Sequence, residues 1–255
     1  MRSIVYTKPG ASSVLELVER EIPEPGAGEV RVRVVVSGVN PTDWKARAGG
    51  TYGDGLPFPE ITPNQDGAGV VDAVGPGVDG LTVGDRVWLF MAAASRPTGT
   101  AQEYTVVPES RVVPLPDGVS FDVGASLGVP AMTAHRALTT HEDGPARLGP
   151  GALDGFTVLV AGGAGAVGHA AIQLARWAGA TVITTISSDA KAALATAAGA
   201  HHVVNYREED AAERIRSIAP DGVDIVVEVS IPQNAALVAD VLANHGVVSI
   251  YANNG

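Results

Sequence analysis

The stretch Phe156-Thr-Val-Leu-Val-Ala-Gly-Gly-Ala-Gly-Ala-Val-Gly168 decides the fold of this chain. Its apolar, β-branched beginning predicts a buried strand, and a glycine-dense turn follows. The alanine-rich segment 169–178 then predicts a helix. This order suits a bound phosphate, because glycine lets the backbone approach the ligand closely. The start of the helix adds exposed N–H groups and the positive end of the helix dipole.

Three glycines of this stretch, Gly163, Gly165 and Gly168, have the G-x-G-x-x-G spacing of dinucleotide-binding loops. The spacing alone is weak evidence in a chain that contains 31 glycines. The strand before it and the helix after it supply the context that the motif requires. The residues expected to hold the pyrophosphate are Gly162, Gly163, Ala164, Gly165, Ala166, Val167 and Gly168.

From Phe156 onward, β-rich runs alternate with helical patterns, which predicts a parallel sheet covered by helices on both faces. The expected strands are 156–161, 181–186, 202–205, 223–229 and 246–251. The expected helices are 169–178, 189–198, 208–219 and 233–244. The pattern therefore predicts an α/β, doubly wound Rossmann domain that lacks its sixth strand.

Residues 1 to about 120 have a different, all-β pattern. Segment 30–36 alternates with period two, and further short β runs are separated by Pro and Gly turns. The sequence 114–118, Pro-Leu-Pro-Asp-Gly, interrupts any regular element, and helical material begins just after it. We therefore expect two domains, a β-rich domain over 1–120 and a dinucleotide-binding domain over 121–255.

Composition excludes several classes of protein. A hydrophobic content of 45% with 18% charged residues indicates a globular chain, and no apolar run approaches the length that spans a bilayer. The N-terminal residues lack the apolar core of a signal peptide, so we expect a cytoplasmic protein with no membrane partner. The net charge of −11 and the absence of a Lys/Arg cluster argue against nucleic acid. With no cysteine, redox chemistry must come from a bound cofactor.

The residues after the second Rossmann strand indicate which cofactor binds. NAD-selective domains place an Asp or Glu there, about 20 residues beyond the glycines, to accept hydrogen bonds from the ribose. This chain instead has Ile186-Ser187-Ser188, whose hydroxyls can donate to a 2′-phosphate, and Lys191 adds a positive charge. NADPH is therefore the expected cofactor. Asp189 keeps NADH as the less favoured alternative, because a small shift would bring its carboxylate toward the ribose.

Other motifs follow in a fixed order: Tyr6-Thr-Lys-Pro-Gly10, Val14-Leu-Glu-Leu17, Gly38-Val-Asn-Pro-Thr-Asp43, Asp66-Gly-Ala-Gly-Val-Val71, Val83-Gly-Asp-Arg-Val87, Ala131-Met-Thr-Ala-His-Arg-Ala-Leu138 and Val204-Asn-Tyr-Arg-Glu-Glu-Asp210. With the glycine loop they resemble the medium-chain dehydrogenase/reductase superfamily, specifically its zinc-independent quinone oxidoreductase (ζ-crystallin-like) branch. The likeness covers essentially the whole chain. It implies a GroES-like, β-rich N-terminal domain joined to the Rossmann domain.

Zinc-dependent members of this family carry a Cys and a His where this chain has Asn40 and Gln65. Neither amide supplies the thiolate or imidazole that zinc prefers. The six histidines are scattered, and the adjacent pair His201-His202 would point to opposite faces of a strand. We therefore expect no zinc and no other metal site.

The resemblance also implies roles for single residues. Asn40 lies beside the nicotinamide ribose in the family pattern, and Thr133 lies near the ring. The backbone around Ala252 and Asn253 holds the carboxamide, and Tyr206 packs beside the adenosine phosphate.

Tyr52 matches a family tyrosine that lines the acceptor pocket. Its phenol could donate a hydrogen bond to a quinone or enone oxygen, and the alternative is an aromatic ring packed in a loop. Asp43 and Asp66 are expected to cap backbone N–H groups rather than to act as acid or base.

The expected function is hydride transfer from NADPH to a quinone or α,β-unsaturated carbonyl compound. Two alternatives remain: an NADPH-binding protein with little turnover, of the crystallin or regulatory kind, and an enoyl-thioester reductase. Related reductases continue beyond the fifth Rossmann strand, so both domains are expected to be truncated at the C-terminal end, either because the sequence is a fragment or because the protein is naturally short. In the family the sixth strand commonly pairs across a homodimer, which makes a homodimer a candidate assembly.

Overall fold

The computed structural model describes residues 1–49 and 55–252. The chain divides into two compact units, Met1–Val129 and Pro130–Gly255, and the division falls within helix α2 (Phe121–Leu138). We describe each unit by itself. The functional domain boundary near residue 120 stays a prediction.

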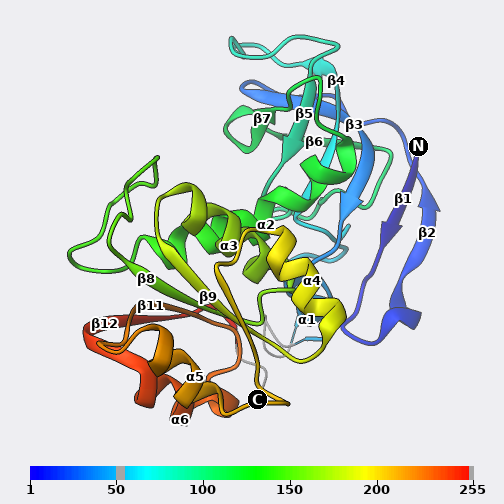
Figure 1. Ribbon diagram of the computed structural model, residues 1–255. Coiled ribbons are helices and arrows are strands. Elements are labelled where there is room, and N and C mark those ends of the chain that lie inside the picture. The colour runs from blue at the N-terminus through cyan, green and yellow to red at the C-terminus, as the bar shows by residue number, and fades with distance from the viewer. Residues whose placement is uncertain (50–54, 253–255) are drawn as a thin grey trace. The chain divides into compact units, whose positions relative to one another are not determined.

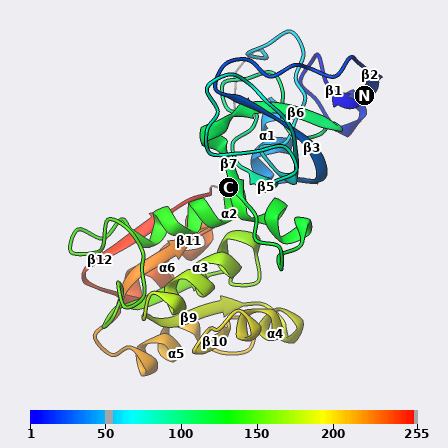
Figure 2. The same ribbon diagram turned by 90° about the horizontal axis from the view of Figure 1, so that it is seen from above.

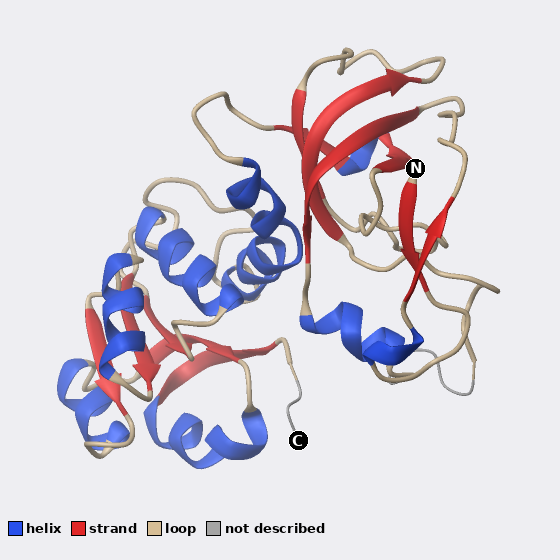
Figure 3. Ribbon diagram, turned by 90° about the vertical axis from the view of Figure 1, so that its right-hand side faces the viewer, coloured by secondary structure: helices blue, strands red, loops and turns tan. Residues whose placement is uncertain are grey.

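The N-terminal unit is built on antiparallel strands, as the period-two pattern predicts (Figure 3). A five-stranded sheet has the order β6-β3-β4-β5-β7, and a separate hairpin-like pair joins β1 and β2. The strands are β1 (Arg2–Val5), β2 (Glu16–Glu19), β3 (Glu29–Gly38), β4 (Asp66–Val74), β5 (Arg86–Leu89), β6 (Tyr104–Pro108) and β7 (Val112–Pro114). The helices are α1 (Pro41–Arg47), the start of α2, and two short 3-10 turns, η1 (Ser12–Val14) and η2 (Glu109–Arg111).

Alternation along β3 explains the core of this unit. Val30 and Val32 are fully buried and pack with Val71, Val87 and Leu89. Arg31, between them, forms ion pairs with Glu24 and Asp72. Apolar side chains on one face of each strand thus meet in a single core.

Two glycines let α2 lie directly against this sheet. Gly124 and Gly128 are one helical turn apart, so they share a face of the helix. A Cβ on Gly124 would stand 3.0 Å from Cβ of Ala68, and one on Gly128 would stand 2.1 Å from Oδ1 of Asp66. Any larger residue at position 128 would therefore displace Asp66.

The C-terminal unit contains a parallel sheet of five strands, which confirms the doubly wound prediction (Figures 1 and 2). The strand order is β10-β9-β8-β11-β12, with helices α3 and α4 on one face and α5 and α6 on the other. The strands are β8 (Thr157–Ala161), β9 (Thr181–Ile186), β10 (His202–Asn205), β11 (Val223–Glu228) and β12 (Leu242–Ile250). The helices are α3 (Ala166–Trp177), α4 (Asp189–Ala197), α5 (Ala211–Ile218) and α6 (Ile231–Val241).

Several boundaries differ from the sequence prediction: helix α5 begins at Ala211 instead of Glu208, and helix α6 spans Ile231–Val241 instead of 233–244. Two further differences have an evident structural cause. Helix α3 begins at Ala166, three residues earlier than expected, because Gly165 is extended (φ −78°, ψ 163°) and serves as its N-cap. Strand β12 begins at Leu242 instead of Gly246, and its register with β11 is irregular between Leu242 and Val247, where His245 has a φ of +64°. None of the helices in the described part of the chain is long and apolar enough to cross a bilayer.

Candidate functional site

Three glycines of the loop 162–168 are each favoured over larger residues for a different structural reason. Gly162 has a φ of +67°, a conformation that favours glycine. A Cβ on Gly163 would stand 2.1 Å from Oγ1 of Thr184, and one on Gly168 would stand 2.4 Å from the carbonyl oxygen of Gly162. The loop is therefore packed tightly onto β9 and onto itself, which holds its backbone in one conformation.

The start of α3 has the backbone features that suit a bound anion. The first backbone N–H groups of any helix have no partner within the helix, and they carry the positive end of its dipole. Gly165 has no side chain to cap them, and the first turn of α3 contains no acidic residue. A phosphate at this place would accept these hydrogen bonds without meeting a negative charge.

The residues after β9 form a second polar region. Nζ of Lys191 donates to Oγ of Ser187 at 2.9 Å, and the exposed Ser188 is the N-cap of α4. Asp189, the acid that kept NADH as an alternative, is the first residue of α4 and is exposed. The structure thus joins two of the predicted phosphate ligands, Ser187 and Lys191, by a hydrogen bond.

A hollow of about 440 Å³ lies beside this region. It extends from Thr185, near the carboxyl end of β9, and Tyr206, which follows β10, to Gln233 and Asn234 in the first turn of α6. Ligands of doubly wound sheets bind at the carboxyl ends of the strands, and Thr185 and Tyr206 bring one end of the hollow to that edge. The rest of its lining includes the carboxylates Glu209, Asp210 and Asp240. Sequence analysis had identified only Tyr206 among these residues.

A buried carboxylate cluster lies in the N-terminal unit, at the start of α1 and β4. Nδ2 of Asn40 donates to Oδ2 of Asp66 at 2.7 Å, and the N–H of Val129 donates to the same oxygen at 2.7 Å. Asn40 and Asp66 are 6% and 0% exposed. The amide of Asn40 is therefore held in one orientation by a carboxylate that is itself anchored to α2.

Asp43 supports the other side of this cluster. Its Oδ2 accepts the N–H of Asn40 at 2.7 Å, and its Oδ1 accepts the N–H of Gln65 at 3.1 Å. The expected capping role of Asp43 is thus confirmed. Asp66 also accepts a backbone N–H, but from helix α2 and not from a local turn, because it begins strand β4.

Burial changes the protonation of both acids. Burial raises the pKa of Asp66 to about 6; the bonds from Val129 and Asn40 oppose this rise, while the charge of Asp43 adds to it. Burial likewise raises the pKa of Asp43, against the hydrogen bonds from Asn40 and Gln65. Oδ1 of Asp66 is buried without a hydrogen-bond partner, and this lack of a donor disfavours the ionised form of the carboxyl group.

The residues at the family's zinc positions do not fit a zinc ion. The amide nitrogen of Asn40 is turned toward Asp66, and amides are poor ligands for this metal. Across the described ranges 1–49 and 55–252, no three His, Cys, Asp or Glu side chains are grouped to hold a metal. No catalytic step is therefore derived through zinc.

The remaining predicted residues are distributed as follows. Thr133 is half-buried in the part of α2 that belongs to the C-terminal unit, whereas Asn40 belongs to the N-terminal unit. Ala252 follows β12 and is half-buried. Tyr52 and Asn253 lie outside the described residues.

Sequence analysis missed one buried acid, Glu228, at the carboxyl end of β11. It is 1% exposed and accepts hydrogen bonds from the N–H of Ser230 and, at 2.9 Å, from Nδ2 of Asn234. An acidic residue that ends an apolar strand of a doubly wound sheet was the available signal, since that edge carries the ligand.

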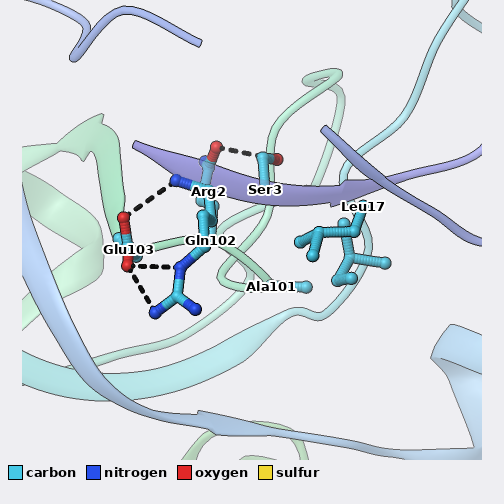
Figure 4. A pocket seen from close by; sticks show the side chains of 7 residues that line it. Arg2, Ser3, Leu17, Ala101, Gln102 and Glu103 are labelled. Atoms are coloured by element: carbon cyan, nitrogen blue, oxygen red, sulfur yellow. Dashed lines mark hydrogen bonds and ion pairs between the residues drawn. The ribbon is translucent and has the colours of Figure 1, made fainter. Parts of the chain in front are cut away.

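A groove of about 180 Å³ in the N-terminal unit contains none of the predicted site residues (Figure 4). Arg2 reaches Glu103 along one side of it at 2.9 Å, and Leu17 lies on the other side. Because both charged side chains are largely exposed, this ion pair contributes little stability.

Comparison with known proteins places these features in a family. Residues 26–117 match the alcohol dehydrogenase GroES-like domain, and residues 166–255 match the zinc-binding dehydrogenase family. The quinone oxidoreductase of Rattus norvegicus is 36% identical over 92% of this chain and 68% of its own length. The 2-haloacrylate reductase of a Burkholderia species is 34% identical over 89% of this chain and 66% of its own length.

A solved structure supports the same assignment. The Escherichia coli quinone oxidoreductase complexed with NADPH matches 99% of this chain and 73% of its own chain, with a TM-score of 0.82 and 28% identity. Together with the glycine loop and the β-rich first unit, these matches show that the chain belongs to the quinone oxidoreductase branch of the medium-chain dehydrogenase/reductase superfamily.

Proposed function

We propose that this protein is a zinc-independent, NADPH-dependent reductase that transfers a hydride to a quinone or an α,β-unsaturated carbonyl compound. The observation that carries the proposal is the packed glycine loop at the start of α3, with the Ser187–Lys191 pair at the end of the neighbouring strand. Relatives named quinone oxidoreductase and 2-haloacrylate reductase support the reaction class.

The choice of NADPH over NADH follows from charge. The ammonium of Lys191 and the hydroxyls of Ser187 and Ser188 are hydrogen-bond donors that a 2′-phosphate accepts. A carboxylate at this place would instead select the free 2′-hydroxyl of NADH. The first acidic residue, Asp189, is in the first turn of α4, where the helix dipole stabilises it.

Bound NADPH supplies the hydride, so the chain has to bind, orient and exclude water. The loop 162–168 would hold the pyrophosphate through the backbone N–H groups at the start of α3, because those of Gly162, Gly163 and Gly165 already donate within the protein. The amide of Asn40, held by Asp66, would present fixed hydrogen-bonding groups to the nicotinamide ribose. Thr133, Ala252 and Asn253 would orient the ring, and Tyr52 would donate a hydrogen bond to the acceptor oxygen.

The acceptor class rests on a shared chemical feature. Quinones and 2-haloacrylate both contain a C=C bond conjugated to a carbonyl group, and hydride addition to such a bond develops negative charge on the carbonyl oxygen. A hydrogen-bond donor near that oxygen stabilises the charge. A conjugated carbonyl compound is therefore the acceptor that we propose.

Replacing Lys191 by methionine tests the cofactor. Because Lys191 is exposed, the substitution should leave the fold intact. We expect the Kd for NADPH to rise about tenfold, through loss of a charge-assisted hydrogen bond, while the Kd for NADH stays unchanged. Lys8→Met, which removes the same charge from an exposed site of the other unit, is the matched control.

The unsubstituted protein tests the reaction. NADPH oxidation is followed with quinones, enones and enoyl-thioesters as acceptors. Turnover with quinones or enones is expected. A preference for NADH would overturn the cofactor assignment, and NADPH binding without turnover on any acceptor would favour the binding-protein alternative.

A further inference from the structure

Glu228 is a buried carboxylate whose role the proposed reaction leaves open. It is 1% exposed, and no cationic side chain in the described part of the chain forms an ion pair with it. Burying a carboxylate is costly unless hydrogen-bond donors compensate for the lost water. The groups that donate hydrogen bonds to Glu228 therefore indicate which part of the structure it stabilises.

Both donors belong to the beginning of α6. Oε1 of Glu228 accepts the backbone N–H of Ser230, the N-cap residue, and Nδ2 of Asn234 at 2.9 Å. The hydroxyl of Ser230 does not cap the backbone of this helix. The negative charge thus stands at the positive end of α6 and ties its first turn to the end of β11.

This first turn forms one wall of the hollow described above. Asn234 lines the hollow together with Gln233, Thr185 and Tyr206. The residue after Glu228 faces the phosphate loop, since Cγ1 of Val229 would be 3.6 Å from a Cβ on Gly162. Glu228 is therefore hydrogen-bonded to a residue of the hollow and followed in the chain by a residue that lies against the glycine loop.

We propose that Glu228 is a positioning residue for the adenosine end of the cofactor: through Asn234 it sets the wall against which the adenosine rests. The inference depends on the proposed NADPH binding. The hollow is assigned to the adenosine end because it is lined by Tyr206, a proposed neighbour of the adenosine phosphate, and by Thr185, which precedes the proposed phosphate ligand Ser187 by two residues. Glu228 itself need not touch the ligand.

Two substitutions in the first turn of α6 distinguish the loss of the hydrogen bond to Glu228 from the effect of an added negative charge in the hollow. Asn234→Asp replaces the donor to Glu228 with a carboxylate that repels it. Gln233→Glu adds the same charge to the same hollow, but Gln233 has no hydrogen bond to Glu228. Calorimetric titration of the full chain with adenosine 2′,5′-bisphosphate and with reduced nicotinamide mononucleotide gives a Kd for each half of the cofactor.

We expect Asn234→Asp to raise the Kd for adenosine 2′,5′-bisphosphate about tenfold beyond the effect of Gln233→Glu, as removal of one buried hydrogen-bond partner predicts. The Kd for reduced nicotinamide mononucleotide should change less than about twofold. Equal effects of the two substitutions, or equal losses for the two ligands, would overturn the inference. If the unsubstituted protein bound neither NADPH nor adenosine 2′,5′-bisphosphate, the proposed function itself would fail, and this inference with it.

A reciprocal exchange provides a rescue test. In the double variant Glu228→Gln, Asn234→Asp, the glutamine oxygen can still accept from Ser230, while its amide can donate to the new carboxylate. The Kd for adenosine 2′,5′-bisphosphate should return to within about threefold of the original value. Recovery of the unfolding temperature without recovery of this Kd would show that Glu228 is merely structural.

Discussion

The glycine loop and the Asn40–Asp66 cluster are built in opposite ways. The loop is a contiguous stretch, 162–168, that offers neutral backbone N–H groups at the start of α3. The cluster joins side chains from α1, β4 and α2, and buries two carboxylates that no cation pairs with among the described ion pairs. The first site depends on the absence of side chains and the second on their presence.

The glycine loop and the Asn40–Asp66 cluster also differ in the free-energy cost of their unpaired polar groups. Loop N–H groups at a helix start stay available for an anion at little cost, because they carry no net charge. In the cluster, an oxygen of Asp66 remains without a partner, and the pKa of the group rises to about 6. The loop should therefore be sensitive to added volume, and the cluster to lost donors and to pH.

Gly168→Ala tests the sensitivity to volume and should have the largest effect. The new Cβ would stand 2.4 Å from the carbonyl oxygen of Gly162, so the loop has to move. We expect the free energy of unfolding to fall by about 3 kcal/mol, measured by urea denaturation, and NADPH binding to be lost.

Gly149→Ala is the matched control in the same unit. It makes the same chemical change where nothing lies within 4 Å of the new Cβ, and it should leave stability almost unchanged. If both variants were equally stable, tight packing would not explain the glycine at position 168.

Asn40→Ala tests the sensitivity to lost donors. It removes the N-cap side chain of α1 and one of the hydrogen bonds to the buried Asp66. We expect a loss of about 2 kcal/mol in urea denaturation at neutral pH, together with a lower kcat/KM. Ser188→Ala removes an N-cap side chain of α4 that makes no capping hydrogen bond, and should cost clearly less. Equal losses would mean that Asp66 does not depend on Asn40.

Asp66→Asn tests the sensitivity to pH and has the smallest expected effect. Because the folded protein raises the pKa of Asp66 from 3.8 to about 6, the folded state holds this proton more tightly than the unfolded state. The resulting stabilisation is complete below the unfolded value and disappears as the pH rises through about 6. Relative to the variant, the unsubstituted protein should lose about 1 kcal/mol between pH 5 and pH 7.5.

Urea denaturation at the two pH values measures this difference. Asp79→Asn makes the same change on an exposed side chain and should show no such pH dependence. A stability difference between Asp66→Asn and the unsubstituted protein that does not vary with pH would mean that Asp66 has its ordinary pKa.

Local patterns were sufficient for most of the fold. The alternation around Val30 and Val32 predicted a half-buried strand, and the apolar run at 157–161 predicted a strand buried on both faces, because side-chain period follows directly from backbone geometry. The start of α3 was misplaced because its N-cap is Gly165, a residue that the loop motif already used. The irregular register of β12 depends on pairing with β11, which sequence spacing does not record.

The candidate site likewise contains features that could be predicted from neighbouring residues and features that depend on the tertiary fold. The glycine loop and the Ser187–Lys191 pair were predictable because their members are separated by a few residues, and the geometry of one turn relates them. The position of Glu228 at the end of an apolar strand points to the ligand edge of the sheet, but its bond to Asn234 is visible only in the tertiary structure. The orientation of the Asn40 amide likewise depends on Asp66.

The sequence by itself determined the alternation of strands and helices, the glycine-rich loop between the first strand and helix of the second unit, and the absence of thiolates, since each follows from neighbouring residues or from composition. The preference for a 2′-phosphate stays a prediction from Ser187, Ser188 and Lys191. Only the tertiary structure decided which carboxylates are buried, which donors hold them and how far burial raises the pKa of Asp66. The physical reason is that desolvation and hydrogen bonding act through space, between residues such as Asp66 and Val129 that are 63 positions apart in the chain.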